Sequence, residues 1–542
     1  MPLMSASGSA AASIAKQVGS VNLLVLVQLA AVGMPLLWLV WASFHQWSFS
    51  DPVGSFSLSS FERLSVSGPA RSAFLHTAGL TCIAAFLSLA VALPVAISVR
   101  SKGEGGLSAL LFLAVPAFAA TPVRGEAWRS LSVLLGLGSP TWTAVPSMVA
   151  AAVPFTAWVA FLGMRSLSPE DLTLARALGI RRSTSVIRLW GRVLVSSLGA
   201  AWLFAGLVIS FDQSTASELY RGSAYLLDDE LRGRLAVQAW SNLAADAAVM
   251  AAIAGLAVTA AAIAWRPVVL AHGQELEGVR RRSSVPAWAL LPAFCVVLAP
   301  AVALAIDSFS SSELSLSLLG GGTVRWWGEA IASTRIAAAT SNSVADCVVA
   351  VGLGVPVGLG AAYQAWRKAA RGSTVAGEYA LWFLPWLVPP TALGIAVSLL
   401  LRALQVPLSL VPTAFYHALY VGPLTAALCL AQMRQIPEGD IALGRALGIS
   451  GSRTLVTLLL PRLLFPLAMA GIAGVAIVWS EVSLAELLSG LDETLPVLLR
   501  GLARSGGTPV IAVVGTTGIG LGLMLLMVIL SSTRSGAGRT AA

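Results

Sequence analysis

Long apolar runs constrain this chain more than any other feature. Runs of about 20 apolar residues recur from residue 21 to residue 530, and a helix of that length crosses the roughly 30 Å hydrocarbon core of a bilayer. The alternating strands of about ten residues that build a membrane β-barrel do not occur in the sequence. Only 11% of the residues are charged, against about 25% in soluble domains. The sequence therefore predicts an all-α integral membrane protein.

About twelve apolar runs are long enough to span the membrane as helices. The third run is interrupted by Pro116 and Pro122 and is the weakest of the set. The first is longer than a signal-peptide core and has no obvious cleavage site, so we expect it to be kept as a helix. The predicted spans cover residues 22–44, 74–99, 107–123, 143–164, 193–211, 243–265, 285–306, 336–364, 379–401, 410–433, 459–479 and 508–530.

The basic residues predict which side of the membrane each loop faces. When the segments between spans are assigned alternately to the two sides, most of the 34 Lys and Arg fall on the side of the two chain ends. Cytoplasmic loops carry such an excess, so we expect both termini in the cytoplasm. The net charge of +9 then reflects orientation, and we expect no nucleic-acid partner.

Residues that carry catalytic or metal chemistry are sparse. The four Cys all fall inside predicted spans, without metal-ligand spacing, so we interpret them as packing residues. The sequence has no phosphate-binding loop, no H-E-x-x-H motif and no convincing catalytic triad. We therefore assign no catalytic residue, no metal and no cofactor, and we do not expect an enzyme. Glycine-rich stretches at 352–360 and 515–522 lie in spans, where small residues let helices approach closely.

A duplicated segment divides the chain. Residues 164–183 match residues 433–452 at ten of twenty positions, at an offset of 269. Glu218 lies over Glu486 at an offset of 268. Self-similarity over such a distance indicates an internal repeat.

We therefore predict two parallel six-helix repeats. The first covers residues 22–265 and the second residues 285–531, joined by a charged cytoplasmic linker at 266–284. Because six is an even number, both repeats enter the membrane in the same orientation, related by an axis along the membrane normal. A substrate path would then run between them.

In each predicted repeat, the duplicated segment is the cytoplasmic loop between the fourth and fifth spans. In the first copy Ser168 is placed to cap a helix and Pro169 suits its first turn. Gly179 is placed to end that helix in a left-handed conformation, and Gly448 occupies the same place in the second copy. A short helix of this kind suits docking into a groove on a partner protein. A helix resting on the lipid surface is the alternative.

These loops resemble the cytoplasmic loop of permease subunits of ATP-binding-cassette importers with the type I, methionine-permease-like fold. The family's loop runs from a glutamate-alanine-alanine sequence to a glycine, and then to a leucine-proline pair. Gly179 and Gly448 match the glycine, and Leu460-Pro461 matches the pair, with Pro461 following Gly448 at the family's spacing. The resemblance covers both repeats, and the fused layout is similar to ferric-iron and thiamine permeases.

The loops also depart from the family's pattern. Residues 173–175 and 442–444 stand where the family has its glutamate-alanine-alanine, and the glutamate is missing from both. Gly191-Arg192 replaces the leucine-proline pair in the first repeat. The contact usually made by that glutamate therefore cannot be assumed, and coupling through the first loop is expected to be altered.

The resemblance implies a multi-pass permease in the inner (plasma) membrane of a bacterial cell, which binds no nucleotide itself. Its implied partners are two copies of a cytoplasmic ATP-binding subunit, a periplasmic or extracellular solute-binding protein, and the lipid bilayer. ATP hydrolysis by those partners would drive alternating access. The residues implied to couple to the ATP-binding subunits are Asp171, Leu174, Arg176, Gly179, Asp440, Leu443, Arg445, Gly448, Leu460 and Pro461.

Four polar residues inside the spans are candidates to line the substrate path, because ionisable groups in a membrane are costly and often functional. Asp346 has Asn342 one helical turn earlier on the same face, and His417 lies close to Tyr420. Packing in the helix bundle is the alternative for each of them.

A twelve-helix secondary transporter of the facilitator type is the alternative function, because it also has two parallel six-helix halves. That family's signature loop lies between its second and third spans, where this chain has only the short segment 99–106. The solute is not identified by the sequence. Thiamine-like, ferric-iron or polyamine-like cargo would fit the slight excess of acidic residues on the predicted outer side.

Overall fold

The structure of the chain, a computed structural model, describes most of the predicted spans. The described residues are 23–47, 54–102, 113, 115, 119–136, 141–165, 177, 179, 191–211, 215, 216, 219, 226–270, 287–311, 322–369, 381–433, 436, 453, 455–505 and 509–539. They are almost entirely helical. The two short strands β1 (His45–Gln46) and β2 (Ser55–Phe56) pair in an antiparallel hairpin.

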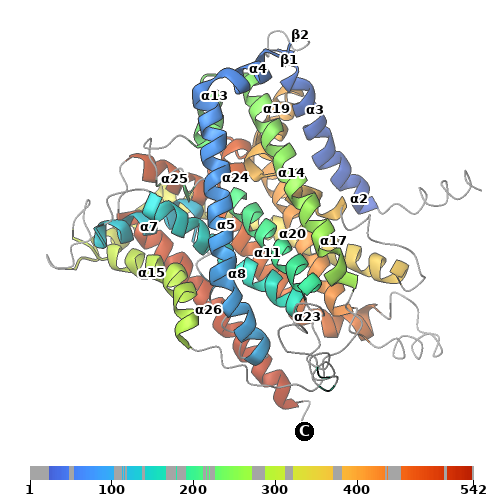
Figure 1. Cartoon of the computed structure of the whole chain (residues 1–542). Helices are drawn as coiled ribbons and strands as arrows, with labels where there is room; N and C mark the ends of the chain where they lie inside the picture. Colours follow the sequence, from blue (N-terminus) through green and yellow to red (C-terminus); the bar gives the residue numbers. More distant parts are fainter. Residues whose placement is uncertain are drawn as a thin grey trace, which may run out of the picture. The chain divides into compact units, whose positions relative to one another are not determined.

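Figure 1 shows the described helices of the first half of the chain. In chain order they are α2 (Leu23–Gln28), the π-helical turn η1 (Leu29–Gly33), α3 (Met34–Ser43), α4 (Ser59–Val66), α5 (Gly68–Lys102), α7 (Thr121–Leu134), α8 (Thr141–Arg165), α11 (Gly191–Phe211), α13 (Leu227–Ala236) and α14 (Trp240–Leu270).

The described helices of the second half of the chain also include long and short ones. In chain order they are the 3₁₀ turn η4 (Ala287–Leu290), α15 (Leu291–Asp307), α16 (Arg325–Ala332), α17 (Thr334–Ala369), the 3₁₀ turn η6 (Leu384–Leu387), α19 (Pro390–Ala403), α20 (Leu410–Met433), the π-helical turn η7 (Leu455–Leu459), α23 (Leu460–Ser480), α24 (Ser483–Leu488), α25 (Leu495–Ser505) and α26 (Pro509–Arg539).

Seven helical segments among the described residues are long and apolar enough to cross a membrane. They are Val25–Ser43, Gly68–Val99, Thr143–Phe161, Trp288–Asp307, Thr334–Lys368, Leu410–Leu430 and Leu460–Ser480. Large apolar side chains such as Phe86 and Val348 are exposed on them, which suits contact with lipid. The predicted class, an all-α protein with apolar membrane-spanning helices, is therefore confirmed, and the number of about twelve spans stays a prediction.

Two predicted spans differ from the helices found. The span predicted at 107–123 ends where α7 begins, and the one predicted at 379–401 is divided between η6 and α19. Pro122 and Pro390 lie in the first turns of α7 and α19, where proline starts a helix but cannot continue one. Each helix has 14 residues, about 21 Å at 1.5 Å per residue, which is short for the hydrocarbon core.

Helix boundaries recur at the offset found in the duplicated loop. Three pairs of helices share the offset of 269 at both their first and their last positions: α7 with α19, α11 with α23, and α14 with α26. Gly136 and Gln405, which follow α7 and α19 at the same offset, both have positive φ, at 65° and 56°. The helix ends are therefore equivalent in backbone conformation as well as in position.

Contacts between residues divide the chain into two compact units. The first unit comprises Met1–Trp38, Ala345–Leu387 and Val411–Val478, and the second comprises Leu39–Val344, Val388–Leu410 and Trp479–Ala542. Each unit therefore takes segments from both predicted repeats.

The core of the first unit joins the start of the chain to helices of the second predicted repeat. Val25 of α2 is buried together with Ala361 of α17, Met433 of α20 and Leu463 of α23. The Tyr416 hydroxyl donates a hydrogen bond of 2.8 Å to the carbonyl oxygen of Ala31. Helix α2 is thus built into the bundle of the second predicted repeat.

The second unit shows the complementary arrangement. Its centre is formed by α5, α8, α11 and α14, with α5 packed along α8 and α11 (Figure 1). Helix α15, the first long helix of the second predicted repeat, packs against α5, α7 and α8, and buries Ala293 and Val297 in their core. The leading helix of each predicted repeat therefore completes a core made mainly by the other repeat.

Candidate functional site

The predicted coupling residues are described only in part. Gly179 is exposed and has a φ of +72°, which confirms the left-handed conformation predicted for it. Leu460 and Pro461 form the first turn of α23, directly after the π-helical turn η7. The other predicted coupling residues lie outside the described part of the chain: Asp171, Leu174, Arg176, Asp440, Leu443, Arg445 and Gly448.

Two of the predicted path residues lie together in the first unit. His417 Nδ1 is 2.9 Å from Asp346 Oδ2 and 3.0 Å from Asp346 Oδ1. Both residues are buried, on α20 and α17 respectively. An acidic and a basic side chain inside apolar helices stabilise one another, because an unpaired charge there would be costly.

The other two predicted path residues have different partners. Tyr420 is buried, and its carbonyl oxygen accepts a hydrogen bond of 3.0 Å from Trp386 Nε1. The Asn342 side-chain amide donates a hydrogen bond of 3.0 Å to the carbonyl oxygen of Glu493. Asn342 therefore anchors the segment between α24 and α25, a contact that the sequence did not predict.

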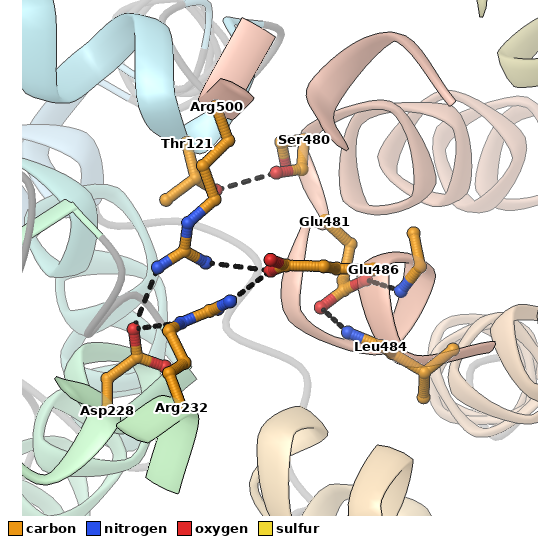
Figure 2. Close-up of polar contacts among 9 residues, drawn as sticks. Thr121, Asp228, Arg232, Ser480, Glu481, Leu484, Glu486 and Arg500 are labelled. Atoms are coloured by element: carbon orange, nitrogen blue, oxygen red, sulfur yellow. Dashed lines mark hydrogen bonds and ion pairs between the residues drawn. The ribbon is translucent and has the colours of Figure 1, made fainter. Parts of the chain in front are cut away.

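A buried cluster of four charges, which we call the charge quartet, lies in the second unit. It consists of Asp228 and Arg232 on α13, Glu486 on α24 and Arg500 on α25 (Figure 2). The side chains of Asp228 and Arg500 are 1% and 2% exposed, and those of Arg232 and Glu486 are 15% and 29% exposed. Two positive and two negative groups thus share one largely desolvated site.

Within the quartet each guanidinium contacts both carboxylates. Arg232 Nε donates to Asp228 Oδ2 at 2.8 Å, and Arg232 Nη1 contacts Glu486 Oε2. Arg500 Nη2 donates to the same Asp228 oxygen at 2.9 Å, and Arg500 Nη1 lies 3.3 Å from Glu486 Oε2. Figure 2 shows Arg232 beside Asp228 and Arg500 on a different helix, with both guanidinium groups reaching Glu486.

Short-range sequence features position these side chains. Asp228 and Arg232 are four positions apart on α13, so they share one helix face. Helix α24 is held at its start by Glu481, whose carboxylate accepts hydrogen bonds from the Leu484 and Ala485 amides at 2.8 and 3.1 Å. A carboxylate at a helix N-terminus is favourable because the free amides and the helix dipole point to it.

The environment shifts the pKa values of the quartet. Burial alone would raise the pKa of Asp228, but the guanidiniums of Arg232 and Arg500 outweigh it and hold that pKa well below its usual range. Burial would lower the pKa of Arg232, but the carboxylates of Asp228 and Glu486 raise it. Burial dominates at Arg500 and lowers its pKa. Asp228 is therefore ionised throughout the physiological pH range.

A second ion cluster braces the same region of the second unit. Arg63 of α4 contacts Glu230 of α13 at 3.1 Å and also pairs with Asp246 of α14. Arg234 contacts Glu230 at 2.8 Å, one helical turn away. Asp246 is fully buried. This cluster ties α13 to its own repeat.

The quartet was missed by the sequence analysis, although the sequence contained a signal for it. Arg232 and Arg500 lie at an offset of 268, the one already found between Glu218 and Glu486. Recurrence of charged residues at one offset marks equivalent positions in two repeats. The mutual contact of these positions could not be predicted, because it depends on how α13, α24 and α25 meet.

An apolar cavity of about 40 Å³ lies among α7, α8, α15 and α26, with Arg124 in its wall. It has room for water but not for a solute of the size of thiamine. No model of a known protein family matches the sequence.

Proposed function

We propose that this chain is the permease subunit of an ATP-driven importer that moves a small solute across the inner membrane of a bacterial cell. The observation that carries the proposal is a double recurrence at one offset. The loop at 164–183 returns at 433–452, and three pairs of described helices begin and end at that same offset. A chance match of one short loop would not extend to helix boundaries far from it.

Two equivalent halves suit a transporter that works by alternating access. The proposed halves cover residues 22–265 and 285–531, linked at 266–284, with about twelve spans in total. Parallel halves related by an axis along the membrane normal leave a path between them. Asp346 and His417 are buried together in helices, and we propose that this pair belongs to the wall of that path.

The duplicated loops would be the attachment points for the motor. A motor made of two copies of one ATP-binding subunit needs two equivalent contacts, and the loops that contain Gly179 and Gly448 supply one in each half. The left-handed backbone at Gly179 gives the first loop the sharp turn that a docking helix needs at its end. On the other side, a solute-binding protein would deliver the cargo.

Gentle purification of the chain from its native membranes, followed by mass spectrometry, tests this function. A co-purifying ATP-binding subunit is the expected result, and a co-purifying solute-binding protein would then be screened for its ligand. If no ATP-binding subunit is captured, even after crosslinking through the loops at 164–192 and 433–462, the importer proposal is wrong. Transport driven by an ion gradient alone would support a facilitator-type carrier instead.

A single substitution tests the role of the first loop. Gly179→Val places a β-branched residue at a φ of +72°, which costs roughly 1–3 kcal/mol and reorients the turn. A Cβ at this position would meet no atom of the described residues within 4 Å. We expect at least a tenfold loss of ATP hydrolysis stimulated by transport, measured on the reconstituted complex, with normal membrane insertion.

Gly136→Val is the matched control. Gly136 has a φ of +65°, and a Cβ there would also meet no atom within 4 Å, but it follows α7 outside the duplicated loops. It should carry the same backbone strain and leave coupling intact. Equal loss of coupling in both variants would show that strain alone, and not the loop, explains the effect.

A further inference from the structure

The charge quartet links the two predicted repeats, and its two arginines lie at equivalent positions. Asp228 and Arg232 belong to the first repeat, and Glu486 and Arg500 belong to the second. Helices α13 and α25 carry the two arginines, and their first positions are related by the same offset of 268 as the arginines themselves. The two arginines are thus equivalent, whereas their acids are not, since Asp228 corresponds to Pro496 at this offset. Each repeat contributes one acid and one arginine, which we call an arm.

Each arginine makes one contact within its own repeat and one to the other repeat. The internal contacts are Arg232 with Asp228 at 2.8 Å and Arg500 with Glu486 at 3.3 Å. The crossing contacts are Arg232 with Glu486, and Arg500 with Asp228 at 2.9 Å. The four groups together carry no net charge, and each internal pair is neutral by itself.

Because of this connectivity, separating the Asp228–Arg232 pair from the Glu486–Arg500 pair costs little electrostatic free energy. Removing one partner of a buried ion pair is strongly destabilising, because it leaves an uncompensated charge. Here the two crossing contacts can break together while each arginine keeps the acid of its own repeat. No unpaired charge is left on either side, so the closed and open arrangements are close in electrostatic free energy.

The packing around the quartet supports such a motion. Helix α13 packs on α5 and α14, whereas α24 packs on α19, and α25 packs on α7 and α26. Among the described residues, neither α24 nor α25 shares an extensive packing surface with α13. The crossing ion pairs therefore provide the polar link between α13 and the α24–α25 segment.

We propose that Asp228, Arg232, Glu486 and Arg500 form a clasp between the two predicted repeats, which opens when the two crossing ion pairs break and each arginine keeps the acid of its own repeat. The proposal rests on the alternating-access function proposed above. The clasp is closed in this structure, and in the open state each arginine would keep only its internal partner.

Distance measurement between two spin labels tests the clasp directly. Exposed Ala236 and Leu491 are replaced by cysteine for labelling, in a full chain whose four native cysteines are changed to alanine, and the protein is placed in lipid nanodiscs. We expect one dominant distance. Glu486→Gln breaks the crossing contact of Arg232 but also removes the acid that Arg500 would keep in the open state, so the open-to-closed ratio should rise by less than about tenfold.

Two further variants keep the test decisive. Glu486→Arg combined with Arg500→Glu exchanges the two charges within one arm, keeps the quartet neutral and places like charges across both crossing contacts. It should therefore open the clasp further than Glu486→Gln does. Arg500→Lys keeps the charge but cannot bridge two acids with a planar fork, and should give an intermediate shift. It also serves if Glu486→Gln does not yield a folded protein.

Glu493→Gln is the matched control, because it removes the ion pair of Glu493 with the exposed Arg335 in the same unit. An unchanged distance distribution in the folded charge-exchange variant (Glu486→Arg with Arg500→Glu) would overturn the clasp, as would an equal shift in Glu493→Gln. The measurement needs neither solute nor ATP-binding subunit. Failure of the importer proposal would therefore show in the co-purification and leave this result standing.

Discussion

The ionisable side chains buried in these helices lie in groups, in which acidic side chains contact basic ones. His417 and Asp346 form a close pair, and the charge quartet satisfies two arginines with two acids. In a protein that is 57% hydrophobic, a lone ionised group in these places would have no water to stabilise it. Sequence analysis selected Asp346 and His417 individually for this reason. Their pairing could not be predicted, since it depends on the relative register of α17 and α20.

Removal of the Asp346 carboxylate should destabilise the protein. In Asp346→Ala the buried imidazole of His417 loses two carboxylate contacts, at a cost of about 1–3 kcal/mol, measured as a lower thermal unfolding midpoint in detergent. Thr340→Ala on the same helix removes only a hydroxyl bond to its own helix backbone and should change little. Equal shifts of the unfolding midpoint in these two variants would show that the Asp346–His417 pair has no special role in stability. Asp346→Asn preserves the shape, so altered transport with near-normal unfolding would place the carboxylate in the path.

At the scale of helices, glycine sets how closely α17 and α20 approach in the first unit. A Cβ on Gly358 would lie 2.3 Å from the Gly422 carbonyl oxygen, and one on Gly354 would lie 2.7 Å from Val421 Cβ. The close packing predicted for the glycine-rich stretch 352–360 is therefore confirmed at Gly354 and Gly358. No side chain of α17 fits at these two positions, and the register of this crossing holds Asp346 against His417.

Gly358→Ala should separate these two helices. The added methyl group would meet backbone atoms that cannot move aside alone, so we expect a loss of about 1–3 kcal/mol in stability, measured by thermal unfolding. Gly352→Ala is the control on the same helix, because a Cβ there meets no atom within 4 Å. It should be neutral or slightly stabilising, since alanine favours a helix by about 1 kcal/mol. A loss of the same size in both would refute the close-approach explanation.

Helix boundaries were predictable where apolar runs are continuous and failed where proline intervenes. The span predicted at 193–211 lies within α11, and the one predicted at 459–479 differs from α23 by one position at each end. Hydropathy alone merged the residues around Pro122 and Pro390 into longer spans, although these prolines begin the shorter helices α7 and α19. Hydropathy averaged over a window of residues does not detect the position at which a proline ends one helix and begins the next.

At the scale of the whole molecule, the leading helices are exchanged between the predicted repeats. Val25 is buried in a core of α17, α20 and α23, whereas α15 packs against α5, α7 and α8. Composition and hydropathy could not predict this exchange, because all of these helices present similar apolar surfaces. The sequence indicated the number of repeats but not which helix completes which core.

Neither repeat should therefore fold alone. A fragment of residues 1–270 lacks α15, and a fragment of residues 285–542 lacks α2 and α3. We expect each fragment to aggregate or be degraded when expressed singly, and the two to recover a stable complex when co-expressed. Size-exclusion chromatography of fluorescent fusions in mild detergent measures both outcomes. A monodisperse peak from either fragment by itself would contradict the structure.

The packing of α2 also determines the order in which contacts can form during biosynthesis. Val25 packs with Ala361, so roughly 340 residues must be added between them, at about 5–20 residues per second. Helix α2 therefore spends on the order of 20 to 70 seconds in the bilayer before the helix surface that it packs against has been synthesised. During that interval lipids, or a membrane chaperone, must occupy the face of α2 that Val25 will later bury. Helix α2 therefore reaches its native contacts with α17 long after it has been made.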